Sequence, residues 1–160
     1  MITLKKKFTD ITNFVFKKKV IVRVDLNLPF FEDKVSDYTR LEKIIPTIDF
    51  LLKNNSKIIL ISHVKKTKRK KKKEQTKKKK KDEIQKFLKK EIYFCADNLK
   101  IIKRDKINKI LERNDIILLE NIRFYPEEES NDDVFAKKIA SLGDIYINEC
   151  FSVSHREHAS

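Results

Sequence analysis

The stretch Val20-Ile-Val-Arg-Val-Asp-Leu26 decides how the rest of this chain is interpreted. β-branched residues fill most of it, which is typical of a strand. A second run, Lys57-Ile-Ile-Leu-Ile-Ser62, is almost continuously apolar, as expected for a strand buried on both faces of a parallel sheet. Three shorter apolar runs, at 92–95, 115–119 and 144–148, are further strand candidates. The chain is therefore predicted to contain a mostly parallel sheet.

Stretches with helical spacing separate these strands. Between 39 and 54, apolar residues recur every three or four positions, which predicts an amphipathic helix that Pro46 should kink. The segments 82–90, 106–113 and 132–142 are further helix candidates. Alternation of strands and helices predicts an α/β fold, with a Rossmann-like, doubly wound parallel sheet and flanking helices.

The charge of the chain is concentrated in one segment. Its 160 residues, 40% of them hydrophobic, fit a single domain that can bury a core. The net charge of +14 first suggests a nucleic-acid or anionic-membrane partner. Lys65–Lys81, however, carries a local net charge of +12. The basicity therefore belongs to a low-complexity loop at 65–81, and we expect only non-specific contacts with nucleic acid.

The remaining composition points to a soluble protein of the cytoplasm. Cys95 and Cys150 lie in apolar runs without metal-ligand spacing, which indicates buried free thiols in a reducing compartment. The first residues lack the apolar stretch of a signal peptide, and no run of 18 apolar residues occurs. We therefore expect no membrane partner.

Polar side chains collect where the predicted strands end, which is where open α/β sheets bind their ligands. Arginine is rare here, with seven arginines among 38 basic residues, yet three of the seven fall at such positions. The planar guanidinium grips carboxylate or phosphate through paired hydrogen bonds that lysine cannot copy. The sequence thus predicts a site for a small anionic metabolite, and the candidates are Asp25, Asn27, Arg40, His63, Arg123 and Arg156.

Some of these residues have more than one interpretation. Asp25 either anchors arginine side chains, accepts a substrate hydroxyl, or is a turn residue before Pro29. His63 taken alone fits a structural role at a strand end. The run Glu127–Glu129 is predicted to be solvated surface leading into a helix N-terminus. No glycine-rich nucleotide loop occurs, and His155-Arg-Glu-His158 lacks a third ligand, so we predict no nucleotide cradle and no metal site.

Six motifs resemble the phosphoglycerate kinase family and occur in the family's order. The match extends through most of the chain. The motifs are Val22-Arg-Val-Asp-Leu-Asn-Leu-Pro29, Asp37-Tyr-Thr-Arg40 with the helix around Pro46, Ile59-Leu-Ile-Ser-His63, Leu118-Leu-Glu-Asn-Ile-Arg-Phe124 with Glu127–Asp132, Phe135–Ala140 and Asn148–Ser160.

The resemblance implies the N-terminal domain of such a kinase, which binds 3-phosphoglycerate or 1,3-bisphosphoglycerate in glycolysis. It implies a catalytic role for Arg40, which stabilises the transferred phosphoryl group. Magnesium-ATP or -ADP would bind to the family's C-terminal domain, and the chain stops at Ser160, before that domain. We expect these residues alone to be monomeric and inactive. The substrate-binding set that the resemblance implies is Asp25, Asn27, Arg40, His63, Lys66, Arg123 and Arg156.

Three departures from the family pattern leave alternatives open. Lys66 replaces an arginine that grips phosphate, and a family glycine is missing from each of Ser62-His-Val-Lys-Lys-Thr67 and Asn148-Glu-Cys-Phe-Ser-Val153. One alternative is a fold that has lost its activity. Another is a decayed domain that binds polyanions or nucleic acid through Lys65–Lys81.

Overall fold

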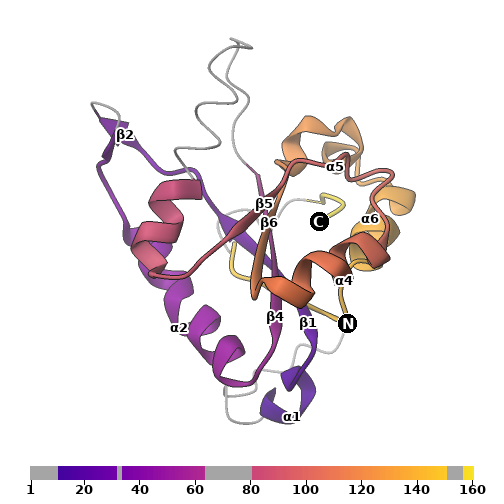
Figure 1. The fold of residues 1–160 in the computed structure, drawn as a ribbon. Helices are drawn as coiled ribbons and strands as arrows, with labels where there is room; N and C mark the ends of the chain where they lie inside the picture. Colours follow the sequence, from indigo (N-terminus) through magenta and orange to yellow (C-terminus); the bar gives the residue numbers. More distant parts are fainter. Residues whose placement is uncertain (1–10, 32–33, 64–80, 151–156) are drawn as a thin grey trace.

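A five-stranded parallel sheet forms the centre of the computed structural model, which describes residues 11–31, 34–63, 81–150 and 157–160 (Figure 1). Its strand order is β5-β6-β4-β1-β7, and every neighbouring pair is parallel. Each strand lies within one residue of its predicted bounds, so the predicted parallel sheet is confirmed. The strands are β1 (Lys19–Asp25), β4 (Lys57–His63), β5 (Tyr93–Cys95), β6 (Ile116–Leu119) and β7 (Ile145–Asn148).

Helices cover both faces of this sheet, which confirms the doubly wound arrangement. On one face, α2 (Thr39–Lys53) and the helical residues 81–88 pack against the even-numbered residues of β1. On the other face, α4 (Arg104–Arg113) and α6 (Asp133–Ala140) pack against Ile21 and its neighbours. Figure 1 shows α2 on one side of the sheet and α4 and α6 on the other.

The proline predicted to disturb α2 does not end it. The helix runs without a break from Thr39 to Lys53, with Pro46 inside it. Pro46 is exposed, and so is Glu42, whose carbonyl would have accepted the amide proton that proline lacks. Water can therefore satisfy that carbonyl, and the buried face of α2 stays intact.

Several short elements escaped the sequence patterns because they contain too few residues to show a period. They are α1 (Thr12–Val15), the antiparallel hairpin of β2 (Phe30–Phe31) and β3 (Lys34–Val35), the 3-10 helix η2 (Ile122–Phe124) and α5 (Pro126–Glu129). The hairpin lies apart from the main sheet, whereas η2 and α5 follow β6 at the carboxyl end of the strands (Figure 1).

The one glycine of the chain marks a close approach between β7 and β1. A Cβ atom at Gly143 would lie 2.7 Å from Ile21 Cγ1 and 3.0 Å from the carbonyl oxygen of Lys19. Cys95 and Cys150 are both buried and free, as predicted. Among the described helices, none has the length and apolar character needed to cross a membrane.

Candidate functional site

Two of the predicted site residues are direct neighbours at the carboxyl edge of the sheet. Asp25 ends β1, His63 ends β4, and the two residues are paired in register. His63 is buried, with only 6% of its surface exposed. Cys150 Sγ, just beyond β7, lies 3.9 Å from His63 Nδ1 and contacts the imidazole from the side of β7. The parallel register therefore brings Asp25 and His63 together, as the sequence predicted.

Arg40 reaches the same edge from the first turn of α2. Its Nε lies 3.4 Å from Asp25 Oδ2, and its Nη1 donates a hydrogen bond to the carbonyl of Asn27. Asp25 Oδ1 also accepts from the backbone amide of Asn27, at 2.9 Å. Asp25 thus combines two of its possible roles, because it anchors an arginine and closes the turn after β1.

Asn27 takes part in this arrangement through its backbone. The sequence predicts that the Asp25 and Asn27 side chains share one face of a strand. The strand ends at Asp25, however, and the contacts that Asn27 makes to Asp25 and Arg40 use its backbone amide and carbonyl. Leu26 and Leu28 nevertheless lie in the same core cluster as Val24, so the shared face of Asp25 and Asn27 is not contradicted and stays a prediction.

Arg123 forms a third side of the edge. It lies in η2, which contacts β4, the strand that His63 ends. Its backbone amide donates to the side chain of Asn121, at 3.1 Å, so the turn is capped locally. Its guanidinium Nη1 donates to Glu129 Oε1, at 2.7 Å, and its side chain is only 10% exposed. Both the backbone and the head group of Arg123 are thus fixed in place.

Other predicted residues lie outside the described part of the chain. Lys66, His155 and Arg156 fall in segments 64–80 and 151–156, and so does most of the lysine-rich loop at 65–81. Their proposed roles stay predictions. In the described ranges, no three His, Cys, Asp or Glu residues gather in a way that could hold a metal ion.

The acidic run after η2 was expected to be solvated, and this expectation is wrong for Glu128. Its side chain is fully buried, and Oε1 lies 3.7 Å from Nη2 of Arg23, which is itself 2% exposed. Ser160 Oγ donates to the same oxygen at 2.6 Å, and the amide of Ala159 donates to the Glu128 carbonyl. A buried arginine needs an acidic partner, so Arg23 inside a β-branched strand was the available signal.

A second contact that the sequence did not reveal fastens α2 to the end of β7. Glu149 follows β7, and its carboxylate accepts a hydrogen bond from the hydroxyl of Thr47, which is buried on α2. The backbone amide of Glu149 donates to the carbonyl of Arg23 at 2.8 Å, which extends the pairing with β1. This contact holds α2, and with it Arg40, against the carboxyl edge of the sheet.

The order of these residues along the chain matches one known family. A sequence model described as phosphoglycerate kinase matches residues 10–160. The chain belongs to the phosphoglycerate kinase family. Phosphoglycerate kinase of Desulforudis audaxviator is 39% identical over 98% of this chain and 39% of its own length. That of Clostridium kluyveri is 40% identical over 100% of this chain and 40% of its own length.

Solved structures of phosphoglycerate kinases share the fold. The enzyme from Coxiella burnetii matches with a TM-score of 0.70 and 25% identity, over 91% of this chain and 36% of that structure. The enzyme from Pyrococcus horikoshii OT3 gives a TM-score of 0.69 and 25% identity, over 92% and 38%. The α/β fold is thus that of the family, and the chain spans about 40% of the length of its curated relatives.

Proposed function

We propose that this chain supplies the 3-phosphoglycerate site of a phosphoglycerate kinase. The reaction is reversible phosphoryl transfer between 1,3-bisphosphoglycerate and ADP, which gives 3-phosphoglycerate and ATP in glycolysis. One observation carries the proposal: Arg40 contacts Asp25, and Asp25 pairs in register with His63, at the carboxyl edge of the sheet. Arg123 adds a second guanidinium, in a turn that contacts β4.

The chemistry of these residues suits a small ligand with two anionic groups. Arginine forks hold carboxylate and phosphate groups at defined angles, which fixes the orientation of the ligand. The Arg40 side chain is 47% exposed, so a ligand can reach it while Asp25 holds its Nε side. The transition state of phosphoryl transfer spreads charge over three oxygens, and a positioned cation stabilises that charge. We assign this catalytic role to Arg40.

The nucleotide belongs to another part of the family's fold. In this proposal, magnesium-ATP or -ADP binds to a C-terminal domain outside these 160 residues, and no step assigned here involves the ion. The residues present bind and orient the substrate. By themselves they should bind 3-phosphoglycerate weakly, catalyse no turnover and remain monomeric. A cytoplasmic location is part of the same proposal.

Titration of the 160-residue chain with 3-phosphoglycerate, followed by NMR and calorimetry, tests the site. Binding at millimolar ligand should shift resonances of Arg40 and Arg123. Arg40→Lys should weaken binding roughly tenfold, because a point charge replaces a bidentate fork. The control is Lys57→Gln at the opposite edge of the sheet, which should leave the affinity unchanged. Shifts that miss both arginines, or an equal loss in the control, would refute the proposal.

A second function has one observation in its favour. Lys65–Lys81 carries a net charge of +12 and begins two residues after His63. Such a segment favours binding of polyanions without sequence preference and with a steep dependence on salt. Deletion of 65–81 should abolish binding of a single-stranded oligonucleotide. If binding survives the deletion, the lysine-rich loop is not responsible.

A further inference from the structure

The three glutamates of α5 make three separate contacts, although the sequence presents them as one acidic run. Glu127 pairs with Lys100, and Glu128 lies buried against Arg23. Glu129 alone contacts a predicted substrate-binding residue, because its Oε1 accepts the hydrogen bond from Arg123 Nη1 at 2.7 Å. A short helix thus places a carboxylate directly on the guanidinium that we expect to bind the substrate.

The contact uses only one corner of the guanidinium. Within the described residues, Arg123 Nε and Nη2 make no hydrogen bond, whereas Nη1 is held by Glu129. The two unused nitrogens form the side of the fork that can grip a carboxylate or phosphate through paired hydrogen bonds. Glu129 therefore occupies neither Nε nor Nη2 of the guanidinium.

The burial of the two partners determines what the contact does. The Arg123 side chain is 10% exposed, while Glu129 is 54% exposed. Water therefore screens the charge of Glu129, which limits its repulsion of a second anion. The hydrogen bond nevertheless restricts rotation of a long side chain, and ordering that side chain before the ligand arrives reduces the entropy lost on binding.

We propose that Glu129 is a positioning residue, which holds Arg123 through Nη1 and presents Nε and Nη2 to an anionic group of the substrate. This proposal rests on the function proposed above. Glu129 does not touch the substrate, and it acts through the orientation of Arg123. The acidic run on α5 thereby becomes a support of the substrate site.

Three single variants separate positioning from other effects, measured by calorimetry with 3-phosphoglycerate. Glu129→Ala removes the hydrogen bond and should weaken binding about fivefold, the cost expected for one lost side-chain restraint. Glu129→Gln keeps an oxygen that accepts from Nη1 and should stay within about twofold of the parent. Glu127→Gln is the matched control on the same helix and should have no effect, since its partner is Lys100.

A measurement without ligand makes the test independent of the proposed substrate. The Nε–Hε signal of Arg123, followed by ¹⁵N relaxation in the free chain, reports the mobility of its side chain. Mobility should rise in Glu129→Ala and stay low in Glu129→Gln, and thermal unfolding confirms that each variant is folded. Unchanged mobility in Glu129→Ala overturns the positioning role, whatever the chain binds.

The binding results have equally clear consequences. Tighter binding in both Glu129→Ala and Glu129→Gln overturns the proposal, because Glu129 would then compete with the substrate. Equal losses in the two variants also overturn it, since the charge and not the hydrogen bond would matter. If the parent chain fails to bind 3-phosphoglycerate while Arg123 is still ordered by Glu129, the proposed function fails. The substrate part of this inference then fails with it.

Discussion

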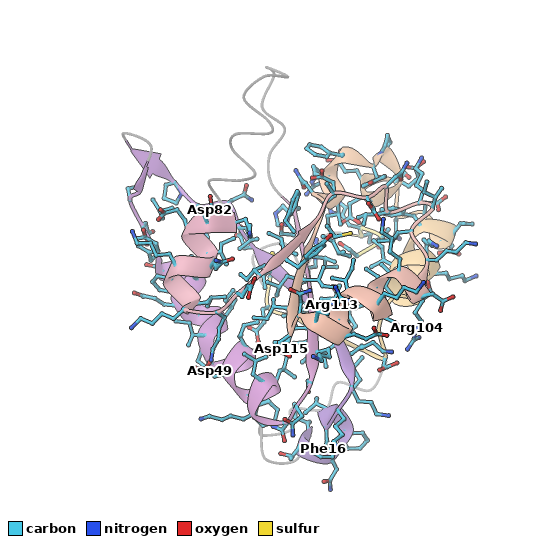
Figure 2. All side chains as sticks on the ribbon, in the orientation of Figure 1. Phe16, Asp49, Asp82, Arg104, Arg113 and Asp115 are labelled. Atoms are coloured by element: carbon cyan, nitrogen blue, oxygen red, sulfur yellow. The ribbon has the colours of Figure 1, made fainter. Side chains whose placement is uncertain are left out.

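The two edges of the same sheet use their charged residues differently. At the amino edge, Lys57 Nζ donates to Asp115 Oδ1 at 2.8 Å, and Arg104 pairs with Asp144. Arg104 and Asp115 are labelled in Figure 2. These pairs join the start of β4 to the start of β6, and α4 to the start of β7. At the carboxyl edge, the contacts from Asp25 to Arg40 and from Glu129 to Arg123 each engage one side of a guanidinium.

The difference separates ion pairs that hold parts of the fold together from ion pairs that hold the arginines proposed to bind the substrate. A cavity of about 350 Å³ lies at the amino edge, and its lining includes Lys57, Lys90 and Arg113 together with Glu91 and Asp115. Cations and acids are mixed there, so the cavity has no excess of arginine forks to select an anion. At the carboxyl edge the described cations are arginines, and Asp25 holds Arg40 while Glu129 holds Arg123. The type and pairing of its charged groups, and not the size of a hollow, are the reason why we propose the carboxyl edge as the substrate edge.

The buried ion pair near the carboxyl edge should have the largest effect on stability. Glu128→Ala leaves the Arg23 guanidinium buried without its acidic partner, which costs about 3 kcal/mol in the free energy of unfolding. Asp115→Asn at the amino edge is the control, and it should cost at most about 1 kcal/mol because that pair is exposed. Urea denaturation monitored by circular dichroism measures both. Similar losses in the two variants would contradict the distinction between the edges.

Reciprocal exchanges of arginine and lysine test the same distinction through binding. Arg123→Lys should weaken 3-phosphoglycerate binding roughly tenfold, or about 1.4 kcal/mol, because the side of the fork that grips the anion is lost. Lys57→Arg at the amino edge should change neither the affinity nor the fold. NMR titration of the two variants provides the comparison. If Arg123→Lys binds as the parent does, a fork is not required at this edge.

The sequence predicted the sheet well because buried parallel strands need long apolar runs. Lys57-Ile-Ile-Leu-Ile-Ser62 is almost continuously apolar, as a strand buried on both faces requires, and the register of β1 and β4 then brings Asp25 to His63. The strand ends therefore predicted that Asp25 and His63 lie side by side at the carboxyl edge, and their role in binding stays a prediction. Arg40 followed from its place at the start of a periodic helix.

The supporting contacts could not be predicted, because they depend on how distant segments meet. Glu127, Glu128 and Glu129 are chemically identical in the sequence, yet their side chains range from half exposed to fully buried. Only the position of α5 over Arg23 and Arg123 separates them. Local propensity carries no information about that position, because α5 is four residues long.

The smallest predicted effect concerns Asp144 at the amino edge. Burial opposes ionisation of its carboxyl group, but hydrogen bonds from the Lys19 amide, at 2.9 Å, and from Arg104 hold its pKa below the ordinary value of 3.8. A carboxyl group whose pKa is lower in the folded than in the unfolded chain stabilises the fold at pH values above its ordinary pKa. This stability is lost as the pH falls through the pKa of the folded state.

Asp144→Asn should therefore lower the free energy of unfolding at pH 7 by about 1 kcal/mol, a value limited by the partial exposure of Arg104. The difference between parent and variant should shrink from pH 5 to pH 3, as the carboxyl group of the parent takes up its proton. Urea titrations at pH 7, 5 and 3 measure this difference. A constant difference at all three pH values would mean that the shape of the Asp144 side chain, and not its charge, stabilises the amino edge. The contrast with the carboxyl edge would then have no electrostatic basis.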